Sequence, residues 1–519
     1  MLALSPEGKR SRVWLQDKLW GSRGKEQAAA SLRQTLFEIR QILGDERPAL
    51  ASDKFNVWLT RDFVEIDLDR PAALADEQAG ELLEGFDIGE EGFEDWLREQ
   101  RLRFGADRTR PAPEPSVDER TSRKDRGASY RPQYQVVLVR GRQSGQDEAS
   151  VLADSLVDSI AKTITELAAA TILDRRGGTE LASESEDIRG SAATLSLRSD
   201  IFGTDTKQLV RLVLLRPPTD TLAWSSTLQL PGRDEIDPNN PTVMRCINQI
   251  VDVVIDQFAK QQDKDLEGVA SSSLCYSGIL HLFRLGKMNF DAADKFFAKA
   301  FEIEPRGIHL AWRAYLRTFL LAERQYACRK TIDEEAFGFM RRALEMEPHN
   351  SYVAGLSAHV HTMMRRSYVA AYELAERSIL LNHANPIGWA CLGIAKSYLG
   401  KSEEGFHHTI LARAIAGSSP FRYQLDALSC IAGTMAGELD RAIHLAEASH
   451  ALAPTFAPPL RYLSALYAHD GQHERSFEMV ERLQAIEPDF SYDKLRDKSY
   501  PAAGLHRSSI IESLPKRQI

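Results

Sequence analysis

The chain has 519 residues, 43% of them hydrophobic and 27% charged, a composition typical of a folded protein with about three domains. A formal net charge of −9 gives no overall electrostatic case for nucleic acid, so any such case must be local. Five scattered cysteines without a Cys-x-x-Cys pair favour buried thiols over disulfides or zinc, and no stretch approaches about 18 consecutive apolar residues. We therefore expect a cytoplasmic multidomain protein without membrane contact.

Residues 1–70 have the order helix, turn, helix, hairpin. Residues 11–20 predict a first helix with Ser11 as its N-cap. Its expected core residues are Val13, Leu15, Leu19 and Trp20. Residues 26–44 predict a second helix, because apolar residues recur there in steps of three and four. Residues 55–59 and 64–67 alternate like two short strands. This order is that of a winged helix-turn-helix, and a generic helical hairpin with a β-arm is the alternative.

The same residues resemble the DNA-binding half of SARP-type bacterial transcriptional activators, an OmpR-like winged-helix family. The matching positions are Pro6, Gly8, Arg12, Leu19, Trp20, Ala28, Leu32, Arg33, Leu36, Ile39, Arg40 and Leu43. Residues 82–104 resemble the start of the helical activator domain of that family. Family members begin with several strands and a full first helix, so the resemblance implies a winged helix-turn-helix that here lacks its N-terminal strands. Either Met1 is an internal start, or the domain is natively truncated.

The resemblance also implies a DNA site. Arg33, Gln34 and Glu38 would face base edges from the second helix, since such side chains read the major groove. The residues expected near phosphates are Arg12, Ser31, Arg40, Lys54 and Arg61. A local group of Lys and Arg residues between positions 9 and 25 would supply positive potential. An ordinary amphipathic surface helix is the alternative interpretation of residues 26–44.

The next two segments differ sharply in composition. Residues 71–104 mix apolar residues with acids, and we expect a solvated helix face there in preference to paired acids for acid–base catalysis. Residues 105–133 are rich in Arg, Asp, Ser and Pro with almost no large apolar residue, which predicts a disordered linker.

Residues 134–262 predict a small α/β module with the order β-α-β-β-β-β-α. This order resembles the TolB-N-like domain of bacterial regulators, in which a strand ends in an aliphatic-Trp pair, here Ala223 and Trp224. Neither a Gly-x-Gly-x-x-Gly nor a Gly-Lys-Ser/Thr loop is present. The segment is therefore expected to be structural or sensory, without catalysis.

Residues 270–495 repeat with a period near 34. Small residues recur at Ala293, Ala336, Ala371, Gly405, Ala442 and Ser476. Twelve residues after each comes a helix-ending position: Pro305, Pro348, His383, Gly417, Pro454 and Pro488. This is the pattern of tetratricopeptide (TPR) repeats, and it predicts six helix pairs in a superhelix whose concave face binds a peptide or protein. The spacing of 43 between the first two small residues implies an insertion around residues 324–333. Residues 499–519 are expected to be a partly disordered tail.

The predicted fold is thus multidomain and mainly α, with a truncated winged helix-turn-helix, a small α/β domain and a C-terminal TPR superhelix. His359, His361, His407 and His408 are expected to be structural, because no acid or Cys set accompanies them at ligand spacing. No enzyme activity, cofactor or metal is expected. The first functional hypothesis is a regulator that binds promoter DNA, with a homodimer plausible. The second is a TPR scaffold that does not bind DNA and keeps a relic winged-helix fragment.

Overall fold

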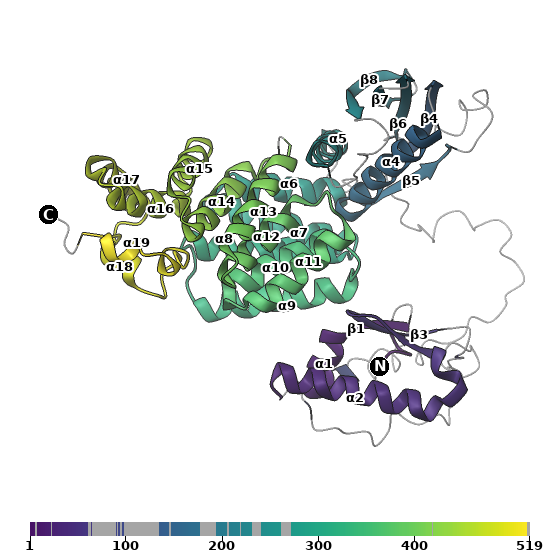
Figure 1. The fold of residues 1–519 in the computed structure, drawn as a ribbon, viewed down its shortest axis with the longest axis horizontal. Coiled ribbons are helices and arrows are strands. Elements are labelled where there is room, and N and C mark those ends of the chain that lie inside the picture. The colour runs from purple at the N-terminus through teal and green to yellow at the C-terminus, as the bar shows by residue number, and fades with distance from the viewer. Residues whose placement is uncertain are drawn as a thin grey trace, which may run out of the picture. The chain divides into compact units, whose positions relative to one another are not determined.

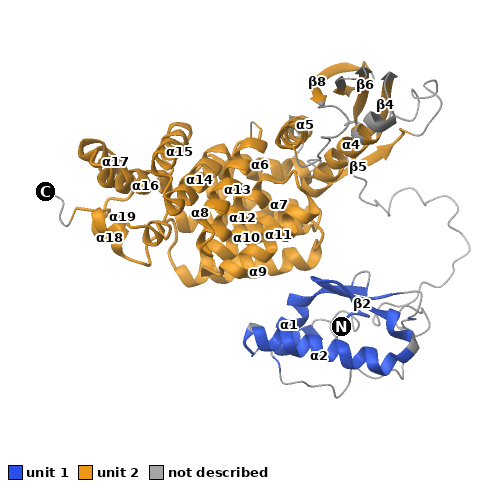
Figure 2. Cartoon of the chain, in the orientation of Figure 1, with its two compact units in different colours: residues 1–129 blue, residues 130–519 orange. Residues whose placement is uncertain are grey.

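The computed structural model describes residues 1–5, 8–21, 23–60, 64, 90, 92–93, 96–97, 134–144, 147–176, 194–204, 207–217, 219–230, 240–260, 271–417 and 419–515. The chain divides into two compact units, residues 1–129 and residues 130–519 (Figure 2). The predicted linker at residues 105–133, Arg61, and residues 65–67 of the expected second strand lie outside the described residues.

In the described part of unit 1, α1 and α2 accompany a three-stranded antiparallel sheet. The elements of this part are β1 (Lys9–Ser11), α1 (Arg12–Trp20), α2 (Lys25–Leu43), the 3-10 helix η2 (Gly44–Ala49), β2 (Leu50–Ser52) and β3 (Asn56–Leu59). The strand order is β1-β3-β2. The hairpin therefore joins residues 50–52 to residues 56–59, upstream of the predicted pair. The reason is Asp53, whose carboxylate accepts hydrogen bonds from the backbone N–H groups of Phe55 and Asn56 at 2.7 and 2.6 Å and turns the chain there.

The core of unit 1 draws on a segment that we expected to be separate. Trp96 and Phe93, from the acidic stretch 71–104, pack with Trp14, and the Trp14 and Trp96 rings meet edge to face at 6.4 Å. Ser11 caps α1 as predicted, because its Oγ accepts a hydrogen bond from the Trp14 N–H at 3.1 Å. The core position predicted for Val13 is wrong: its side chain is 65% exposed, since the helix turns Trp14 inward instead.

Unit 2 begins with a five-stranded sheet. Its elements are β4 (Tyr134–Ser144), α4 (Asp147–Leu167), β5 (Ala170–Asp174), β6 (Thr194–Thr204), β7 (Lys207–Arg216), β8 (Thr221–Leu230) and α5 (Pro241–Lys260), in the order that the sequence predicts. The sheet order is β5-β4-β6-β7-β8. β4 is parallel to β5 and β6, and the last three strands are antiparallel. Apolar residues from α4 and α5 share one core with the alternate residues of the strands.

Six antiparallel helix pairs follow (Figure 1). They are α6 (Ser271–Phe283) with α7 (Lys287–Ile303), α8 (Gly307–Ala322) with α9 (Arg329–Met346), α10 (Ser351–Arg365) with α11 (Tyr368–Leu381), α12 (Pro386–Tyr398) with α13 (Ser402–Ile415), α14 (Arg422–Ala436) with α15 (Leu439–Leu452), and α16 (Ala457–His469) with α17 (His473–Ile486). The predicted small residues all lie on the second helix of a pair and are buried. Every second helix ends two residues before its predicted helix-ending position. The repeat pattern of the sequence is therefore confirmed.

The C-terminal segment is part of the fold. It contains α18 (Tyr492–Arg496), the 3-10 helix η6 (Leu505–Arg507) and α19 (Ile510–Ser513). Tyr500, Leu505, Ile510 and Leu514 are buried in the core that the last three helix pairs share. The partly disordered tail predicted for residues 499–519 is thus wrong for residues 499–515. Among the described residues, no helix is long and apolar enough to cross a membrane.

Candidate interaction surfaces

The inner face of the superhelix, formed by the first helix of each pair, is filled by the chain's own side chains. Tyr315 of α8 donates a hydrogen bond from its hydroxyl to Oε1 of Gln424 on α14 at 2.7 Å, across 109 residues of sequence. The ring of Phe319 stacks on that of Phe456 with centroids 6.1 Å apart. Phe283 of α6 packs against Tyr423 at the start of α14. These side chains are almost completely buried, so the concave face predicted to bind a peptide is packed core, and that part of the prediction is wrong.

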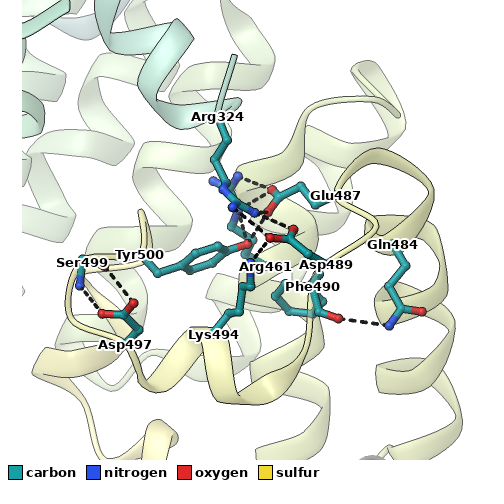
Figure 3. A network of polar contacts seen from close by, with 10 residues as sticks. All are labelled: Arg324, Arg461, Gln484, Glu487, Asp489, Phe490, Lys494, Asp497, Ser499 and Tyr500. Carbon is teal, nitrogen blue, oxygen red and sulfur yellow. Dashed lines mark hydrogen bonds and ion pairs between the residues drawn. The ribbon is translucent and has the colours of Figure 1, made fainter. Parts of the chain in front are cut away.

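A polar network closes the superhelix at its far end (Figure 3). Arg324, in the turn after α8, donates to Oε2 of Glu487 at 3.0 Å and to Oδ1 of Asp489 at 2.8 Å. From the other side, fully buried Arg461 of α16 donates to Oε1 of Glu487 at 3.0 Å and to the Tyr500 hydroxyl at 2.9 Å. The Tyr500 hydroxyl donates in turn to Oε2 of Glu487 at 2.7 Å. The second helix pair, the sixth pair and the C-terminal segment are thereby joined.

The predicted insertion supplies this contact. Arg324 lies at its start and adopts a left-handed backbone conformation with φ of 55°, which side chains other than Gly, Asn and Asp rarely take. The adjoining residue, Glu323, is buried and accepts a hydrogen bond from the Ala457 N–H at 3.2 Å. Burial raises the pKa of Glu323 to about 7, against the opposing attraction of Arg461. The closure therefore places a titratable carboxyl between the second and sixth pairs.

The α/β module is fixed to the repeats by buried polar groups. The Glu166 carboxylate at the end of α4 accepts hydrogen bonds from Ser351 N and Oγ at 3.0 and 2.6 Å and from Asn382 Nδ2 at 2.9 Å. Burial raises the pKa of Glu166, and these donors oppose the shift. On α5, Asn248 Nδ2 donates to the carbonyls of Ala384 and Ile415 at 2.8 and 3.0 Å. Residues 130–519 are consequently one compact unit, although their sequence predicts two domains.

The residues predicted to read base edges lie on the outward side of α2. Arg33 is exposed, while Leu32 and Leu36 are buried. Gln34 and Glu38 bond to each other, with Gln34 Nε2 donating to Glu38 Oε1 at 2.7 Å. Phe37 on the same face is 57% exposed. The helix thus presents a mixed surface, with one aromatic ring among its polar groups.

The residues predicted to lie near phosphates make contacts within unit 1. Arg12 Nε donates to the Asp53 carbonyl at 2.8 Å, and Arg40 Nε donates to the Leu50 carbonyl at 3.0 Å. Both guanidinium groups also donate to Ser52 Oγ, at 3.1 and 2.7 Å. Arg12 and Arg40 therefore hold the hairpin against the two helices.

The two remaining described phosphate candidates also have neighbours inside the unit. Ser31 Oγ accepts a hydrogen bond from Arg23 Nη1 at 3.3 Å. The Lys54 ammonium lies over the Phe55 ring, 5.3 Å from its centroid.

The outer surface of the repeats carries the exposed apolar side chains. Six of them lie on second helices of the pairs: Met288, Met346, Val369, Leu380, Leu452 and Phe477. Two more, Tyr326 and Leu399, lie in connecting turns, and none of the first helices exposes a large apolar residue among those described. Apolar contact with a partner is thus offered by the outer helices and turns.

Two hollows open on the repeats. One of 340 Å³ adjoins the closing network and is lined by Arg324, Tyr326, Asp493, Lys494, Asp497, Ser499, Tyr500 and Pro501. The other, of 240 Å³, is lined by residues of α13 to α15 and the turn between the last two. In the described part of the chain, no group of three His, Cys, Asp or Glu residues could hold a metal ion. His359 is buried against the Tyr315 ring, and burial lowers its pKa to about 4.

No family model and no curated protein sequence matches the chain. Solved structures resemble parts of it. YrrB, a TPR protein with an unusual peptide-binding site, is 18% identical over 37% of this chain and 93% of its own, with a TM-score of 0.24. PilW, a type IV pilus biogenesis factor, is 17% identical over 38% of this chain and 89% of its own, with a TM-score of 0.29. Cut9 with Hcn1 of the APC/C is 14% identical over 54% of this chain and 57% of that chain, with a TM-score of 0.36. At these values the likenesses carry no functional argument, and the TPR-like architecture rests on the six helix pairs described above.

Proposed function

We propose that this chain is a protein-interaction scaffold, in which the compact unit of residues 130–519 binds a protein partner through its outer helices. The observation that carries the proposal is the distribution of exposed apolar residues. The inner helices are packed against one another, whereas the outer helices expose Met288, Val369 and Leu380 by 85%, 60% and 59%. Large exposed apolar residues mark interaction sites where they gather on one surface.

The fixed joint between the α/β module and the repeats supports the same function. Buried hydrogen bonds between α4, α5 and the repeats keep the module in one orientation, so a partner would meet a preformed surface and lose little conformational entropy on docking.

Site-specific photocrosslinking in cells tests the proposal. A photoreactive amino acid at Met288, Leu380 or Leu452 should crosslink the chain to one recurring protein, because these side chains point outward. The matched control places the same group at His359, which is 5% exposed and lies on an inner helix. A crosslink to a foreign peptide from His359, or none from any outer position, would contradict the scaffold proposal.

DNA binding by unit 1 is the second candidate function. One observation favours it: the side chains of Arg33, Gln34 and Glu38 on α2 are exposed, and the same unit contains a three-stranded antiparallel sheet. In a mobility shift with promoter fragments, Arg33→Ala should weaken binding to a specific site by about 1–3 kcal/mol, while Lys54→Ala should weaken all sequences alike. If the full chain shifts no fragment, or if neither substitution alters the shift, this candidate fails and the scaffold proposal is unaffected.

A further inference from the structure

The outer strand of the α/β sheet, β8, has an unusual edge. β8 pairs with β7 on one side, and among the described residues no strand pairs with its other side (Figure 1). An edge strand presents a row of backbone N–H and C=O groups that can pair with another chain, and natural proteins usually block such edges with charges, Pro, bulges or short length.

β8 has almost none of these protections. It runs for ten residues, TLAWSSTLQL, and contains no charged residue and no Pro. Each of the other four strands carries at least one charged residue. The pairing of β8 with β7 has one irregularity, opposite Leu214 and Leu215, and is regular from Trp224 to Leu230. The described residues therefore leave a seven-residue, uncharged edge without a pairing strand.

The opposite edge of the sheet shows the contrast. β5 is only five residues long and ends at Asp174, whose carboxylate is bound by Arg176. Just before it, the Ala169 N–H donates to Ser272 Oγ of the first repeat helix at 2.6 Å. That edge is short, charged and attached to the repeats, so the two edges of one sheet differ in what they can accept.

We infer that β8 pairs antiparallel with β8 of a second copy of this chain, which joins two five-stranded sheets into one. A second copy fits because a two-fold antiparallel pair brings a strand against itself, and β8 carries no charge that would meet a like charge there. The inference goes beyond the proposed function, because it assigns an interface that the outer repeat helices do not use.

The side chains of β8 fix the register of such a pair. Leu228 lies in the core with α4 and α5, whereas Ser225, Thr227 and Gln229 are exposed on the opposite face. A two-fold axis perpendicular to the sheet keeps the helices of both copies on one side, so each residue must face one of the same parity. An axis through Thr227 uses all seven regular residues. It sets Thr227 opposite itself and Ser225 opposite Gln229 of the partner.

This register makes two double variants behave differently. In Ser225→Lys/Gln229→Lys, both cross-copy pairs become like charges, and in Ser225→Lys/Gln229→Glu both become opposite charges. Within one chain these positions directly face Val213 and Leu209, and the exposed Arg211, opposite Thr227, is diagonal to both. The thermal unfolding of each monomeric variant therefore measures the effect of Arg211 separately from the effect on association. The side chains are exposed, so both variants should fold, and circular dichroism and thermal unfolding check this.

Sedimentation of the full chain over a wide micromolar range measures the outcome. We expect the wild-type chain to exchange between monomer and dimer, the Lys/Lys variant to dissociate about ten-fold more readily, and the Lys/Glu variant to associate at least as well as wild type. Two results would overturn the inference. One is a wild-type chain that stays monomeric throughout, as it would if β8 receives a strand of another protein. The other is an equal response of the two variants, since only the symmetric register separates them.

Crosslinking gives an independent readout. Of the five cysteines only Cys328 is exposed, so a Cys328→Ser background leaves no other accessible thiol. Thr227→Cys in that background should form a covalent dimer on mild oxidation, because each Cys faces its copy at the axis. The matched control, Thr221→Cys, is also exposed on β8 but would face a position beyond the partner strand. Equal crosslinking of the two would refute this register.

Discussion

Glu323 gives the sharpest test of how the superhelix is closed. Its carboxyl is buried between α8 and α16, and its pKa is raised from 4.5 to about 7. The folded protein therefore binds this proton more tightly than the unfolded chain does. Below pH 4.5 Glu323 is protonated in both states and does not reduce the free energy of unfolding. As the pH rises from 4.5 to 7, the free energy of unfolding falls, and above pH 7 it stays lower by the full contribution of this group.

The size of the effect comes from the same two values. A shift from 4.5 to about 7 corresponds to a loss of about 3 kcal/mol at high pH, and most of that loss develops between pH 5 and pH 8. Glu323→Gln keeps an oxygen to accept the Ala457 N–H but cannot ionise. Relative to wild type, the variant should therefore gain about 2–3 kcal/mol of stability on going from pH 5 to pH 8.

Urea unfolding followed by circular dichroism, at constant ionic strength and at pH 5, 6, 7 and 8, measures this gain. Tyr500→Phe is the matched control within the same network. Burial, with the charge and hydrogen bond of Glu487, raises the pKa of Tyr500 well above this pH range. The effect of removing its hydroxyl, about 1–2 kcal/mol, should therefore not depend on pH. A pH-independent difference between Glu323→Gln and wild type would refute the reasoning that Glu323 is held in a closed, dry interface.

Three further outcomes follow from the same contacts. Arg461→Met should cost about 3–5 kcal/mol in urea unfolding, because it leaves buried carboxylates without their cation. Arg324→Met should cost about 1 kcal/mol or less, because the Arg324 side chain is 30% exposed. Equal losses in the two variants would contradict the role of burial. Tyr315→Phe should cost about 1–2 kcal/mol in the same assay by removing the hydrogen bond across the inner face, and an unchanged stability would mean that this face is open. Arg40→Met should speed hydrogen exchange in residues 50–59 of the full chain, while Arg33→Met should not, since only Arg40 bonds to the hairpin; equal protection in both would show that the Arg40 contacts are dispensable.

Features of the structure that depend on residues close together in the sequence were predicted correctly. The small residues of the repeats and the positions that end each second helix follow from close helix approach and from Pro, which act within one pair. The Ser11 cap acts over three residues and was predictable for the same reason. The exposure of Val13 was not predictable, because the helix could bury the face with Val13 or the face with Trp14. Trp96, more than 80 residues away, packs against Trp14 and decides between them.

The sites were less predictable than the fold. Arg12 and Arg40 fit a DNA-contact pattern as sequence, but both donate to Ser52 once the hairpin is placed. Asn248 and Glu166 had no signal at all, since a polar residue on an amphipathic helix looks solvent-exposed until another element covers it.

The sequence by itself determined the six helix pairs, the order of elements in the α/β module and the neutral character of β8, because these depend on period, propensity and composition. Only the tertiary structure decided that the superhelix closes on itself. That closure joins Tyr315 to Gln424 and Arg324 to Glu487, 109 and 163 residues apart, and no local pattern encodes which distant side chains meet. It converts an expected binding groove into core, and in the described part of residues 130–519 it leaves exposed the outer helices and the edge of β8, the two surfaces that we propose for contact with other chains.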